Sequence, residues 1–549
     1  MSTDKKKLIS QNNEYIIPLF AIVSLLISCI ILSEKKYFWN DELYSYYFLA
    51  DQSFSHMMAA FSDKINNTPP LYFLLGWLWA RVFGSTEISL RLFSSLGICI
   101  AYVLVWVTLR RTYNFWSTNI GSLSIFFTSE LIISQNAEAR MYGLFLAICA
   151  WAFLQFDINN RSEKISWSII ISNICIHAAL VNTHLYGFFY SGAIIFAQIV
   201  RDRYFQILRP KIYLCIILSW VSIIPYIPAF LNQADAGKPR AWIPIPTFQD
   251  LISFLTFSRS WFSKIFIILI LIIIFVWQFL IYKSDKTRAY KVSFKNNQKL
   301  KAEKSLLIFA YSFLAVPVLV WIISQNFKPI FWDRYMIPNT LSWSILLAHL
   351  TSCIFVNSKS NQKRTYKNSV FLLTLTTILI FTPVIYAKVF PKDQLPGFND
   401  KKYGHKDLPI VTQFSNNFLT RLHYSPDRNR YFFILDRQAA LDKASGLFGS
   451  QEYKHLDALK RNYPALFNNQ ILKSEEFLNM YNRFLVLDDI NYDQKCPLEV
   501  KGLEKADKWE NMHCPRWVEM RILNNPDYKL THLGDIDAKA LLLVEKQKF

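Results

Sequence analysis

The sequence predicts a polytopic α-helical membrane protein with a small α/β domain at its C-terminus. The chain has 549 residues, of which 52% are hydrophobic and 16% aromatic, and only 14 are glycine. This is too apolar for a soluble protein of this length. The runs 15–31, 265–281 and 370–387 carry almost no charge and approach the ~20 residues that cross a bilayer. After Lys388 the composition becomes mixed and polar, which indicates a domain outside the lipid.

Hydropathy predicts about eleven spanning helices. They lie near residues 15–33, 90–109, 115–134, 140–157, 165–183, 186–200, 212–231, 264–282, 305–324, 335–356 and 369–387. The first run follows Lys5, Lys6 and Lys7 but is long and lacks a small-x-small cleavage site, so we interpret it as a retained anchor. Six of the eight cysteines fall inside these spans, where thiols behave as small apolar groups.

The segment 70–84 decides the topology. It is apolar, but it is short for a span, contains Arg81 and begins with Pro69-Pro70. If it does not cross, every basic cluster faces the cytoplasmic side, as the positive-inside rule requires. These clusters are Lys5 to Lys7, Arg110-Arg111, Arg161 with Lys164, Arg201 with Arg203 and Arg209, the loop from Lys283 to Lys304, and Lys359 to Lys367. We therefore predict that 70–84 lies along the outer surface, inside a first outer loop with juxtamembrane helices.

This topology predicts a bacterial inner-membrane protein with a cytoplasmic N-terminus and an extracytoplasmic, periplasmic C-terminal domain. The basic residues on the cytoplasmic side also account for the formal charge of +20. Binding of nucleic acid does not explain this charge, because the sequence has no basic stripe interleaved with aromatic residues. We interpret the Lys283 to Lys304 loop as a topology determinant, with specific binding of anionic lipid heads as the alternative.

The chain thus divides into a membrane domain, 1–387, and a C-terminal domain, 388–549. The tail has strand-like runs at 431–435, 484–487 and 540–544, separated by helix-compatible stretches. Cys496 and Cys514 are the only cysteines outside the spans, and in an oxidising compartment we expect them to form a disulfide.

Two adjacent acids, Asp41 and Glu42, follow the end of the first span. One interpretation is a helix start, with Asn40 as the cap and the acids in the first turn, where they complement the helix dipole. The other is a general base whose pKa is raised by partial burial and which takes a proton from an acceptor hydroxyl. Spacing alone favours the helix start.

Other polar groups gather on the outer face under this topology. They are Arg91, Glu138, Arg140, His184, Arg240 and Asp333-Arg334. A single arginine at a membrane boundary is usually a snorkelling anchor, whereas several converging arginines suit a phosphate, which they bind in a planar, bidentate fashion. His184 by itself fits a hydrogen-bonded interfacial residue better than a ligand.

No motif predicts a metal, a cofactor or a nucleotide. The chain has no His-x-x-x-His, no Cys-x-x-Cys and no acidic triplet, and it has neither Gly-x-x-x-x-Gly-Lys nor Gly-x-Gly-x-x-Gly. We expect no bound cofactor, no metal and no nucleotide donor.

Taken together, five segments resemble the GT-C glycosyltransferases of the protein mannosyltransferase and aminoarabinose transferase (ArnT-like) superfamily, also called glycosyltransferase family 39-like. In order, they are Asp41-Glu42; Thr68-Pro-Pro-Leu-Tyr72 with Ile88-Ser-Leu-Arg-Leu-Phe-Ser94; Ala137-Glu-Ala-Arg-Met-Tyr142; Thr183-His-Leu-Tyr-Gly187; and Asp333-Arg-Tyr-Met-Ile-Pro338. The Glu-Ala-Arg-Met-Tyr string is the most specific. The resemblance covers residues 15–385, and Ala137 stands where glutamine is expected.

The resemblance implies a GT-C fold and a glycosyltransferase that takes a sugar from a polyprenyl-phosphate donor. The acceptor would be lipid A, another surface glycan such as lipopolysaccharide, or a protein hydroxyl, met at the outer face of the membrane. It implies Asp41 as the catalytic acid-base residue, with Glu42 beside it in the catalytic site, and inversion by direct displacement without a covalent intermediate. The donor phosphate and sugar would be bound by Arg91, Glu138, Arg140, Tyr142, His184, Arg334 and Tyr335.

Two interpretations from other classes compete with this one. A lipid or glycan transporter or flippase would also have many spans and an outer domain, but transporters usually place ionisable groups near the middle of the membrane. A non-catalytic scaffold is the second. Aromatic residues such as Trp39, Tyr44, Tyr72 and Trp77 fit an interfacial belt as well as a site for the prenyl chain or sugar.

Overall fold

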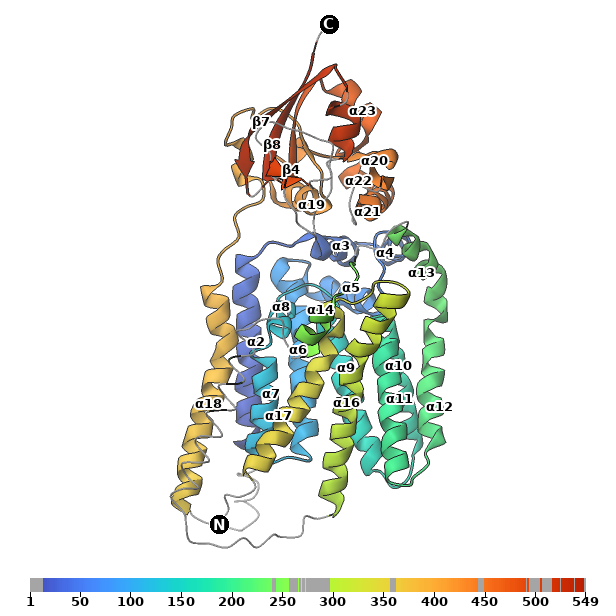
Figure 1. Cartoon of the computed structure of the whole chain (residues 1–549), viewed down its shortest axis with the longest axis vertical. Coiled ribbons are helices and arrows are strands. Elements are labelled where there is room, and N and C mark those ends of the chain that lie inside the picture. The colour runs from blue at the N-terminus through green and yellow to red at the C-terminus, as the bar shows by residue number, and fades with distance from the viewer. Residues whose placement is uncertain are drawn as a thin grey trace. The chain divides into compact units, whose positions relative to one another are not determined.

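A computed structural model of the whole chain describes residues 13–238, 243–255, 265, 268, 272, 297–355, 362–442, 449–489, 491–492, 504–505, 516–523, 525–537 and 539–547 (Figure 1). The chain forms two compact units. The helical unit comprises Met1–Lys35, Pro69–Pro225 and Ile245–Pro391. The sheet unit comprises Lys36–Thr68, Tyr226–Pro244 and Lys392–Phe549.

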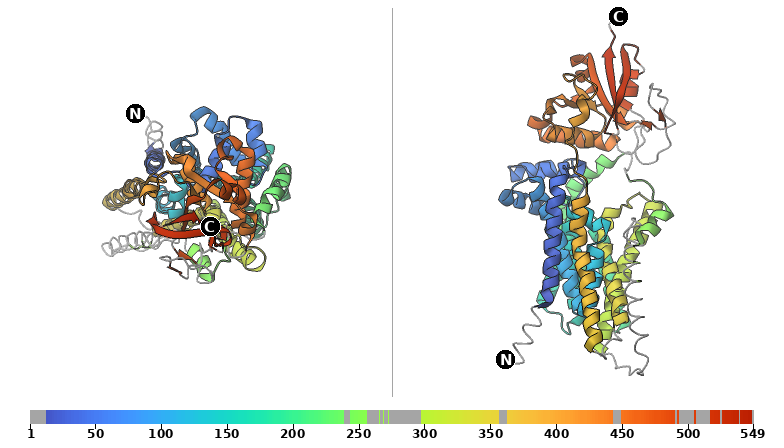
Figure 2. Two further views of the ribbon diagram at one scale, coloured as in Figure 1. Left: turned by 90° about the horizontal axis from the view of Figure 1, so that it is seen from above. Right: turned by 90° about the vertical axis from the view of Figure 1, so that its left-hand side faces the viewer.

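The helical unit consists of α-helices with short 3-10 segments (Figures 1 and 2). Its described elements are α2 (Ile16–Lys35), α5 (Leu71–Phe83), α6 (Glu87–Arg110), α7 (Phe115–Phe126), α8 (Glu130–Asn136), α9 (Tyr142–Arg161), α10 (Trp167–Thr183), α11 (Gly187–Tyr204), α12 (Pro210–Ser219), η2 (Trp220–Tyr226), α14 (Phe248–Leu255), α16 (Asn297–Asn326), η4 (Asp333–Asn339), α17 (Thr340–Phe355) and α18 (Gln362–Val389).

Six stretches of the described chain are long and apolar enough to cross a membrane. They are Ile16–Lys35, Glu87–Arg110, Tyr142–Arg161, Pro210–Gly237, Gln298–Asn326 and Val370–Val389. The chain is therefore a helical membrane protein, but the predicted number of about eleven spans is not reached among the described residues. Of the predicted span 264–282, the structure describes only residues 265, 268 and 272.

The predicted span 115–134 is not one helix. It consists of α7, which has 12 residues, and the separate α8. At 1.5 Å per residue α7 is only ~18 Å long, short of a ~30 Å hydrocarbon core. The chain breaks at Thr128 and Ser129: the Thr128 hydroxyl donates to the Ser124 carbonyl (2.5 Å), and Ser129 is extended at the N-cap of α8. Hydroxyl side chains that bond to nearby backbone in this way compete with helix continuation.

Helices α6 and α9 pack in very close contact through glycines. A Cβ on Gly143 would lie 2.0 Å from the Ser94 carbonyl oxygen, and one on Gly97 would lie 2.4 Å from the Gly143 carbonyl carbon. Small residues allow this approach, which is the usual way helices associate in lipid. The contact holds the start of α9 against the first turns of α6.

The ends of α2 and α6 show that α5 does not cross the membrane. The Arg91 guanidinium, near the start of α6, donates to the Ser33 carbonyl near the end of α2 (3.5 Å). Arg110, at the other end of α6, makes two hydrogen bonds to Glu14 (2.9 and 2.8 Å), which precedes α2. The two helices are thus antiparallel neighbours, and the 13-residue α5 between them is only ~20 Å long. The prediction that 70–84 does not span is confirmed.

The basic residues predicted to share one face gather around the end of α9. Arg111 and Arg161 both pair with Asp157 (2.6 and 2.8 Å). Arg209 donates to the Asn159 carbonyl, and Arg201 donates to the Asn160 carbonyl (3.1 Å). The clusters after α6, α9 and α11 therefore lie at one end of the helical unit, as the charge pattern predicts.

The sheet unit combines the first loop with the tail. Its helices are α3 (Asn40–Leu49), α4 (Phe54–Phe61), α13 (Ile227–Ala234), α19 (Ser415–Tyr424), α20 (Arg437–Leu441), α21 (Gly449–Asn462), α22 (Pro464–Phe467), α23 (Ser474–Met480) and α24 (Arg516–Val518). Its strands are β1 (Ile410–Thr412), β2 (Tyr431–Leu435), β3 (Ile471–Lys473), β4 (Arg483–Asp489), β5 (Asn491–Tyr492), β6 (Glu504–Lys505), β7 (Tyr528–Ile536) and β8 (Lys539–Lys546).

Six strands form a mixed sheet in the order β3-β2-β1-β4-β8-β7 (Figure 1). Strands β1 to β4 are parallel neighbours, whereas β8 is antiparallel to both β4 and β7. Alternate side chains such as Phe432, Val486 and Leu542 bury one face under α23 and α24, and Phe418 of α19 packs on Phe433 on the other face. The predicted strands at 431–435, 484–487 and 540–544 are confirmed as β2, β4 and β8.

The first loop is tied to the tail by hydrogen bonds. The Phe38 backbone N–H donates to the Tyr424 hydroxyl (2.9 Å), and the Tyr463 hydroxyl donates to the Tyr47 carbonyl (3.1 Å). Arg461 of α21 bonds both carboxylate oxygens of Asp63 (3.0 Å each). The predicted boundary at residue 388 therefore marks where the tail begins. It separates the tail from Lys36–Thr68, which belongs to the same unit. Cys496 and Cys514 lie outside the described residues, so their disulfide stays a prediction.

Candidate functional site

The residues predicted for the site fall into two groups, one in each unit. The helical unit contains Arg91, Glu138, Arg140, Tyr142, His184, Arg334 and Tyr335, and the sheet unit contains Asp41 and Glu42. Each group is described within its own unit.

The turn between α8 and α9 carries Glu138 and Arg140, and Asn136 anchors it. The buried Asn136 amide donates to the Leu25 carbonyl (3.0 Å) and the Ser28 hydroxyl (3.1 Å) of α2. Its oxygen accepts from the Ser95 hydroxyl of α6 (2.8 Å). One side chain thus joins α8 to both α2 and α6. Because apolar surroundings make such bonds costly to lose, the turn has a fixed place in the unit.

A second bond fixes the backbone of Arg140. The Ser94 hydroxyl donates to the Arg140 carbonyl (2.8 Å), beside the close contact of Gly143 with α6. Arg91 lies one turn before Ser94 on the same helix and is fully buried. Its side chain therefore belongs to the packed interior at this end of α6, not to a snorkelling anchor at the lipid boundary.

Aromatic rings from three segments surround His184. The ring centroid of His184 lies 5.0 Å from Tyr335, 5.4 Å from Tyr186 and 6.0 Å from Tyr142. The Arg334 guanidinium lies 5.7 Å from the Tyr142 ring centroid. The start of α9, the turn after α10 and the start of η4 thus meet, and the predicted residues Tyr142, His184, Arg334 and Tyr335 form one cluster.

This cluster has a positive electrostatic field. Burial lowers the pKa of His184 from its ordinary value, and the charges of Arg140 and Arg334 lower it further. The Tyr186 backbone N–H donates to Nδ1 of His184 (3.1 Å), so the neutral ring carries its proton on Nε2. A neutral imidazole N–H flanked by two guanidinium groups favours an anion, because all three groups can donate hydrogen bonds to it and the guanidinium groups are positively charged.

An irregular segment presents Arg334 and Tyr335. Within η4, Met336 leaves the helical region (φ −104°, ψ 17°). The Tyr190 hydroxyl of α11 donates to the Asn339 side-chain oxygen (3.1 Å), and the Tyr186 hydroxyl bonds to the Ile330 carbonyl. These bonds hold the segment at both ends. The sequence predicts a spanning helix from 335, but the structure begins regular α-helix only at Thr340.

In the sheet unit, α3 begins at the predicted acidic pair. The predicted cap is wrong: Trp39 occupies the N-cap position, and Asn40 is the first helical residue. The Glu42 carboxylate accepts from the Trp39 backbone N–H (3.3 Å) and is fully buried, so Glu42 has the helix-start role. Asp41 is partly exposed in the first turn of α3.

Helix α21 brings residues to Asp41 that sequence patterns did not indicate. The His455 ring lies 5.4 Å from the Tyr44 ring, its Nδ1 bonds to the Lys64 carbonyl, and its Nε2 is bonded by Gln451 (2.9 Å). Burial lowers the pKa of His455, while the charge of Asp41 raises it. Asp41 therefore lies within electrostatic range of His455. An isolated histidine in a polar tail helix carries no sequence signal for this placement.

Several predictions are not tested by this geometry. Arg240 lies outside the described residues. In the described part of the chain, no three His, Cys, Asp or Glu side chains lie close enough to hold a metal ion. In the helical unit, the arginine, histidine and tyrosine side chains of the cluster form an arrangement that can bind an anion.

No family model and no curated protein matches the chain in sequence. Among solved structures, the crystal structure of ArnT from Cupriavidus metallidurans in the apo state superposes with a TM-score of 0.52 at 9% identity, covering 96% of this chain and 97% of that chain. ArnT from the same organism bound to undecaprenyl phosphate gives 0.47 at 10% identity over 96% and 97% of the two chains. Archaeal oligosaccharyltransferase AglB from Archaeoglobus fulgidus, in complex with an inhibitory peptide and a dolichol-phosphate, gives 0.42 at 10% identity over 86% and 70%.

The first of these likenesses shows that the chain has an ArnT-like fold over nearly its whole length. The GT-C fold predicted from the five motif segments is confirmed.

Proposed function

We propose that this protein is a glycosyltransferase that moves a sugar from a polyprenyl-phosphate donor to an acceptor hydroxyl or phosphate at the outer face of the bacterial inner membrane. The observation that carries the proposal is the cluster of Arg140, Arg334, neutral His184 and three tyrosines at one end of an ArnT-like helical unit. Two arginines, an imidazole N–H and aromatic surfaces suit a phosphate joined to a sugar.

The proposed reaction is a direct displacement at the anomeric carbon. The Asp41 carboxylate takes the proton of the acceptor hydroxyl, and the acceptor oxygen forms the new bond to the anomeric carbon. The bond from that carbon to the phosphate oxygen breaks, and polyprenyl phosphate leaves with the bonding electrons. Arginine side chains stabilise the negative charge that develops on the leaving phosphate. The step needs one base and inverts the anomeric centre.

Within this proposal, Asp41 is the base and Glu42 is a positioning residue. Glu42 is buried and accepts from the Trp39 backbone N–H at the start of α3, whereas Asp41 is partly exposed. Arg140 and Arg334 bind the donor phosphate, Arg91 and Glu138 support the turn beside them, and Tyr142, His184 and Tyr335 contact the phosphate or sugar.

Charge placement favours a transferase over a transporter or flippase. The charged residues of α6, for example, are Glu87, Arg91 and Arg110, all in its first or last two turns. Transport proteins usually place ionisable groups near mid-membrane. The acceptor is left open between lipid A, another surface glycan and a protein hydroxyl.

The donor site is tested by binding of polyprenyl phosphate to the purified full-length protein. Arg334→Gln removes a guanidinium from the cluster, and we expect ~10-fold or greater loss of affinity, the range of a charge-assisted hydrogen bond. Lys328→Gln, an exposed lysine that follows α16, is the matched control and should bind as the wild type. Wild-type affinity in Arg334→Gln would contradict the assignment.

The sugar and acceptor are identified by the glycan and lipid profile of a strain that lacks the protein. The proposal requires one sugar substituent to disappear from an envelope component while its polyprenyl-phosphate form accumulates. A profile unchanged in both respects would contradict the proposed function.

A further inference from the structure

A second basic cluster lies at the other end of the helical unit from Arg91 and Arg140. Arg91 and Arg110 belong to the same helix, α6, and at 1.5 Å per residue they are ~28 Å apart along its axis. Arg140 and Arg161 likewise lie just before the start and at the end of α9. The residues around Arg110 and Arg161 therefore take no part in the proposed donor site.

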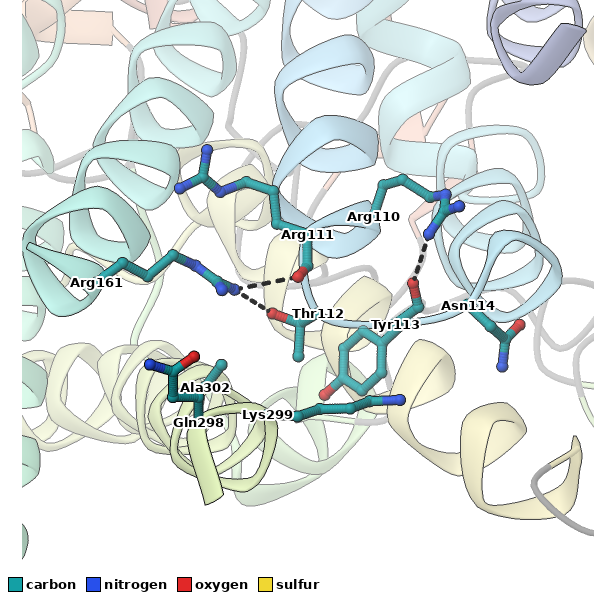
Figure 3. Close-up of a pocket in the computed structure, with 9 residues that line it drawn as sticks. All are labelled: Arg110, Arg111, Thr112, Tyr113, Asn114, Arg161, Gln298, Lys299 and Ala302. Carbon is teal, nitrogen blue, oxygen red and sulfur yellow. Dashed lines mark hydrogen bonds between the residues drawn. The ribbon is translucent and has the colours of Figure 1, made fainter. Parts of the chain in front are cut away.

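These residues line a cavity of about 390 Å³ (Figure 3). The lining consists of Arg110, Arg111, Thr112, Tyr113, Asn114, Arg161, Gln298, Lys299 and Ala302. It comes from the turn after α6, the end of α9 and the first turns of α16, so the cavity is a space between helix ends. Its volume falls in the range of small-molecule sites.

The arginines are fixed by bonds to the protein. Arg161 donates to both carboxylate oxygens of Asp157 (2.9 and 2.8 Å) and, through Nη2, to the Thr112 hydroxyl (2.7 Å). Arg110 is held by Glu14 and donates to the Tyr113 carbonyl (3.2 Å). Figure 3 shows Arg161 bonded to the Thr112 hydroxyl and the Arg111 carbonyl, and Arg110 bonded to the Tyr113 carbonyl, with Lys299 on α16. Arginines held in this way lose little entropy when an anion binds.

The charge of the cavity is unbalanced. Four cations line it, namely Arg110, Arg111, Arg161 and Lys299, and the lining contains no carboxylate. Asp157 is shared by two of the arginines, and Glu14 pairs with a third. A third carboxylate, Glu303 of α16, lies near Tyr113. Among the described residues Lys299 has no ion-pair partner, which leaves a positive charge in the lining of the cavity.

Helix α7 adds to the positive field. Asn114 is its N-cap and accepts from the Ser117 backbone N–H (2.9 Å), so the partial positive charge of the α7 N-terminus lies at the cavity wall. Fixed guanidinium groups, a lysine and a helix N-terminus together suit the negatively charged oxygens of a phosphate.

We propose that this cavity binds a phosphate group, and that in the membrane the phosphate is the headgroup of an anionic phospholipid. Basic pockets between the ends of spanning helices are the usual binding places of such headgroups. The positions of Arg110 and Arg161 at the ends of spanning helices put the cavity at headgroup level rather than in the hydrocarbon. The proposal does not depend on the proposed transferase function.

The test uses the purified full-length protein in bilayer nanodiscs of phosphatidylcholine with or without phosphatidylglycerol. Native mass spectrometry measures the lipids that stay bound, and a separate arm adds inorganic phosphate to the nanodiscs of pure phosphatidylcholine and measures thermal unfolding. Lys299→Gln removes the exposed cation of the cavity, and Lys301→Gln is the matched control on the same helix, because Lys301 faces the Phe205 ring (5.8 Å) instead.

We expect phosphatidylglycerol to be retained over phosphatidylcholine, with ~5-fold weaker retention in Lys299→Gln and no change in Lys301→Gln. Stabilisation by inorganic phosphate, lost in Lys299→Gln and without lipid preference, would support the phosphate site and assign it to a soluble ligand. Indifference to both probes, or an equal loss in Lys301→Gln, would overturn the proposal.

Discussion

Glu452 of α21 has a carboxyl group whose environment disfavours the ionised form. Burial raises the pKa of Glu452, although the Ser415 hydroxyl and backbone N–H both donate to it (2.7 and 3.1 Å) and lower that pKa in part. Because the folded-state pKa is above the unfolded value, the native state binds more protons between the two. Stability therefore falls as pH rises through that window.

This gives a prediction for Glu452→Gln. The amide oxygen still accepts from Ser415 but never ionises, so the variant should be more stable than the wild type at pH 7, with the difference vanishing below the ordinary pKa of glutamate. Thermal unfolding at pH 4 and pH 7.5 measures it. Asp407→Asn, at an exposed position, should show no such pH-dependent difference. A less stable Glu452→Gln at pH 7.5 would contradict this account.

At the same scale, the sequence predicted which residues lie together better than what each one does. Arg140, His184 and Arg334 were proposed from their common face, and the helical unit brings them together. The sequence favours Asn40 as the cap because asparagine is a preferred cap residue. In the structure, the carboxylate of Glu42 accepts from the backbone N–H of Trp39, three residues earlier. The sequence does not indicate His455, because its place beside Tyr44 comes from the tertiary packing of α21 on the first loop.

Among the elements, the α6 and α9 pair depends on Gly143. A Cβ there would lie 2.0 Å from the Ser94 carbonyl oxygen. Because this oxygen belongs to the backbone of α6, it cannot move aside by a side-chain rotation. We predict that Gly143→Ala destabilises the protein by ~1–3 kcal/mol, the range for overpacking, and displaces the turn that carries Arg140. Unfolding temperature and binding of polyprenyl phosphate should both fall.

Gly192→Ala is the matched control for this prediction. Gly192 is also within a helix of the same unit, α11, but nothing lies within 4 Å of its Cβ position. Alanine there should leave binding unchanged and raise stability by up to ~1 kcal/mol, because glycine loses more backbone freedom on folding. If both substitutions have the same effect, the close contact of α6 and α9 is not what positions the turn.

The elements were predictable where hydropathy is continuous and less so where polar side chains interrupt it. The spans at α2, α6 and α9 follow from apolar runs of sufficient length. Residues 115–134 also form an apolar run, yet α7 ends at Phe126, where the Thr128 hydroxyl bonds to the local backbone and Ser129 is extended at the N-cap of α8. A window average does not detect such a break.

For the whole molecule, antiparallel α2 and α6 predict the sidedness of the first loop. Reporters fused after Ser33 and after Gly84 should both indicate the outer side, because α5 does not cross between them. A cytoplasmic signal after Gly84 with an outer signal after Ser33 would contradict the arrangement in which Arg91 meets Ser33 and Arg110 meets Glu14. A fusion after Arg111 should report the cytoplasmic side and is the internal control.

The global fold could be predicted from the sequence because few chain arrangements are stable in lipid. Backbone groups in hydrocarbon must be bonded within helices, and basic clusters fix which ends face the same side. The sheet unit was accessible only in part. Three of its strands are apolar runs, but its inclusion of residues 36–68 and 226–244 depends on contacts such as Arg461 with Asp63, which join positions far apart in sequence.

The central claim is sugar transfer from a polyprenyl-phosphate donor with Asp41 as the base. It is tested most directly by release of polyprenyl phosphate from a labelled polyprenyl-phosphate sugar, measured with purified wild type and Asp41→Asn in the presence of envelope acceptor. Asparagine keeps the shape of the side chain and Glu42 has the helix-start role, so the variant should fold and bind donor normally. We predict wild-type transfer and a ~10²- to 10⁴-fold loss in Asp41→Asn. Transfer by Asp41→Asn at the wild-type rate would contradict the account.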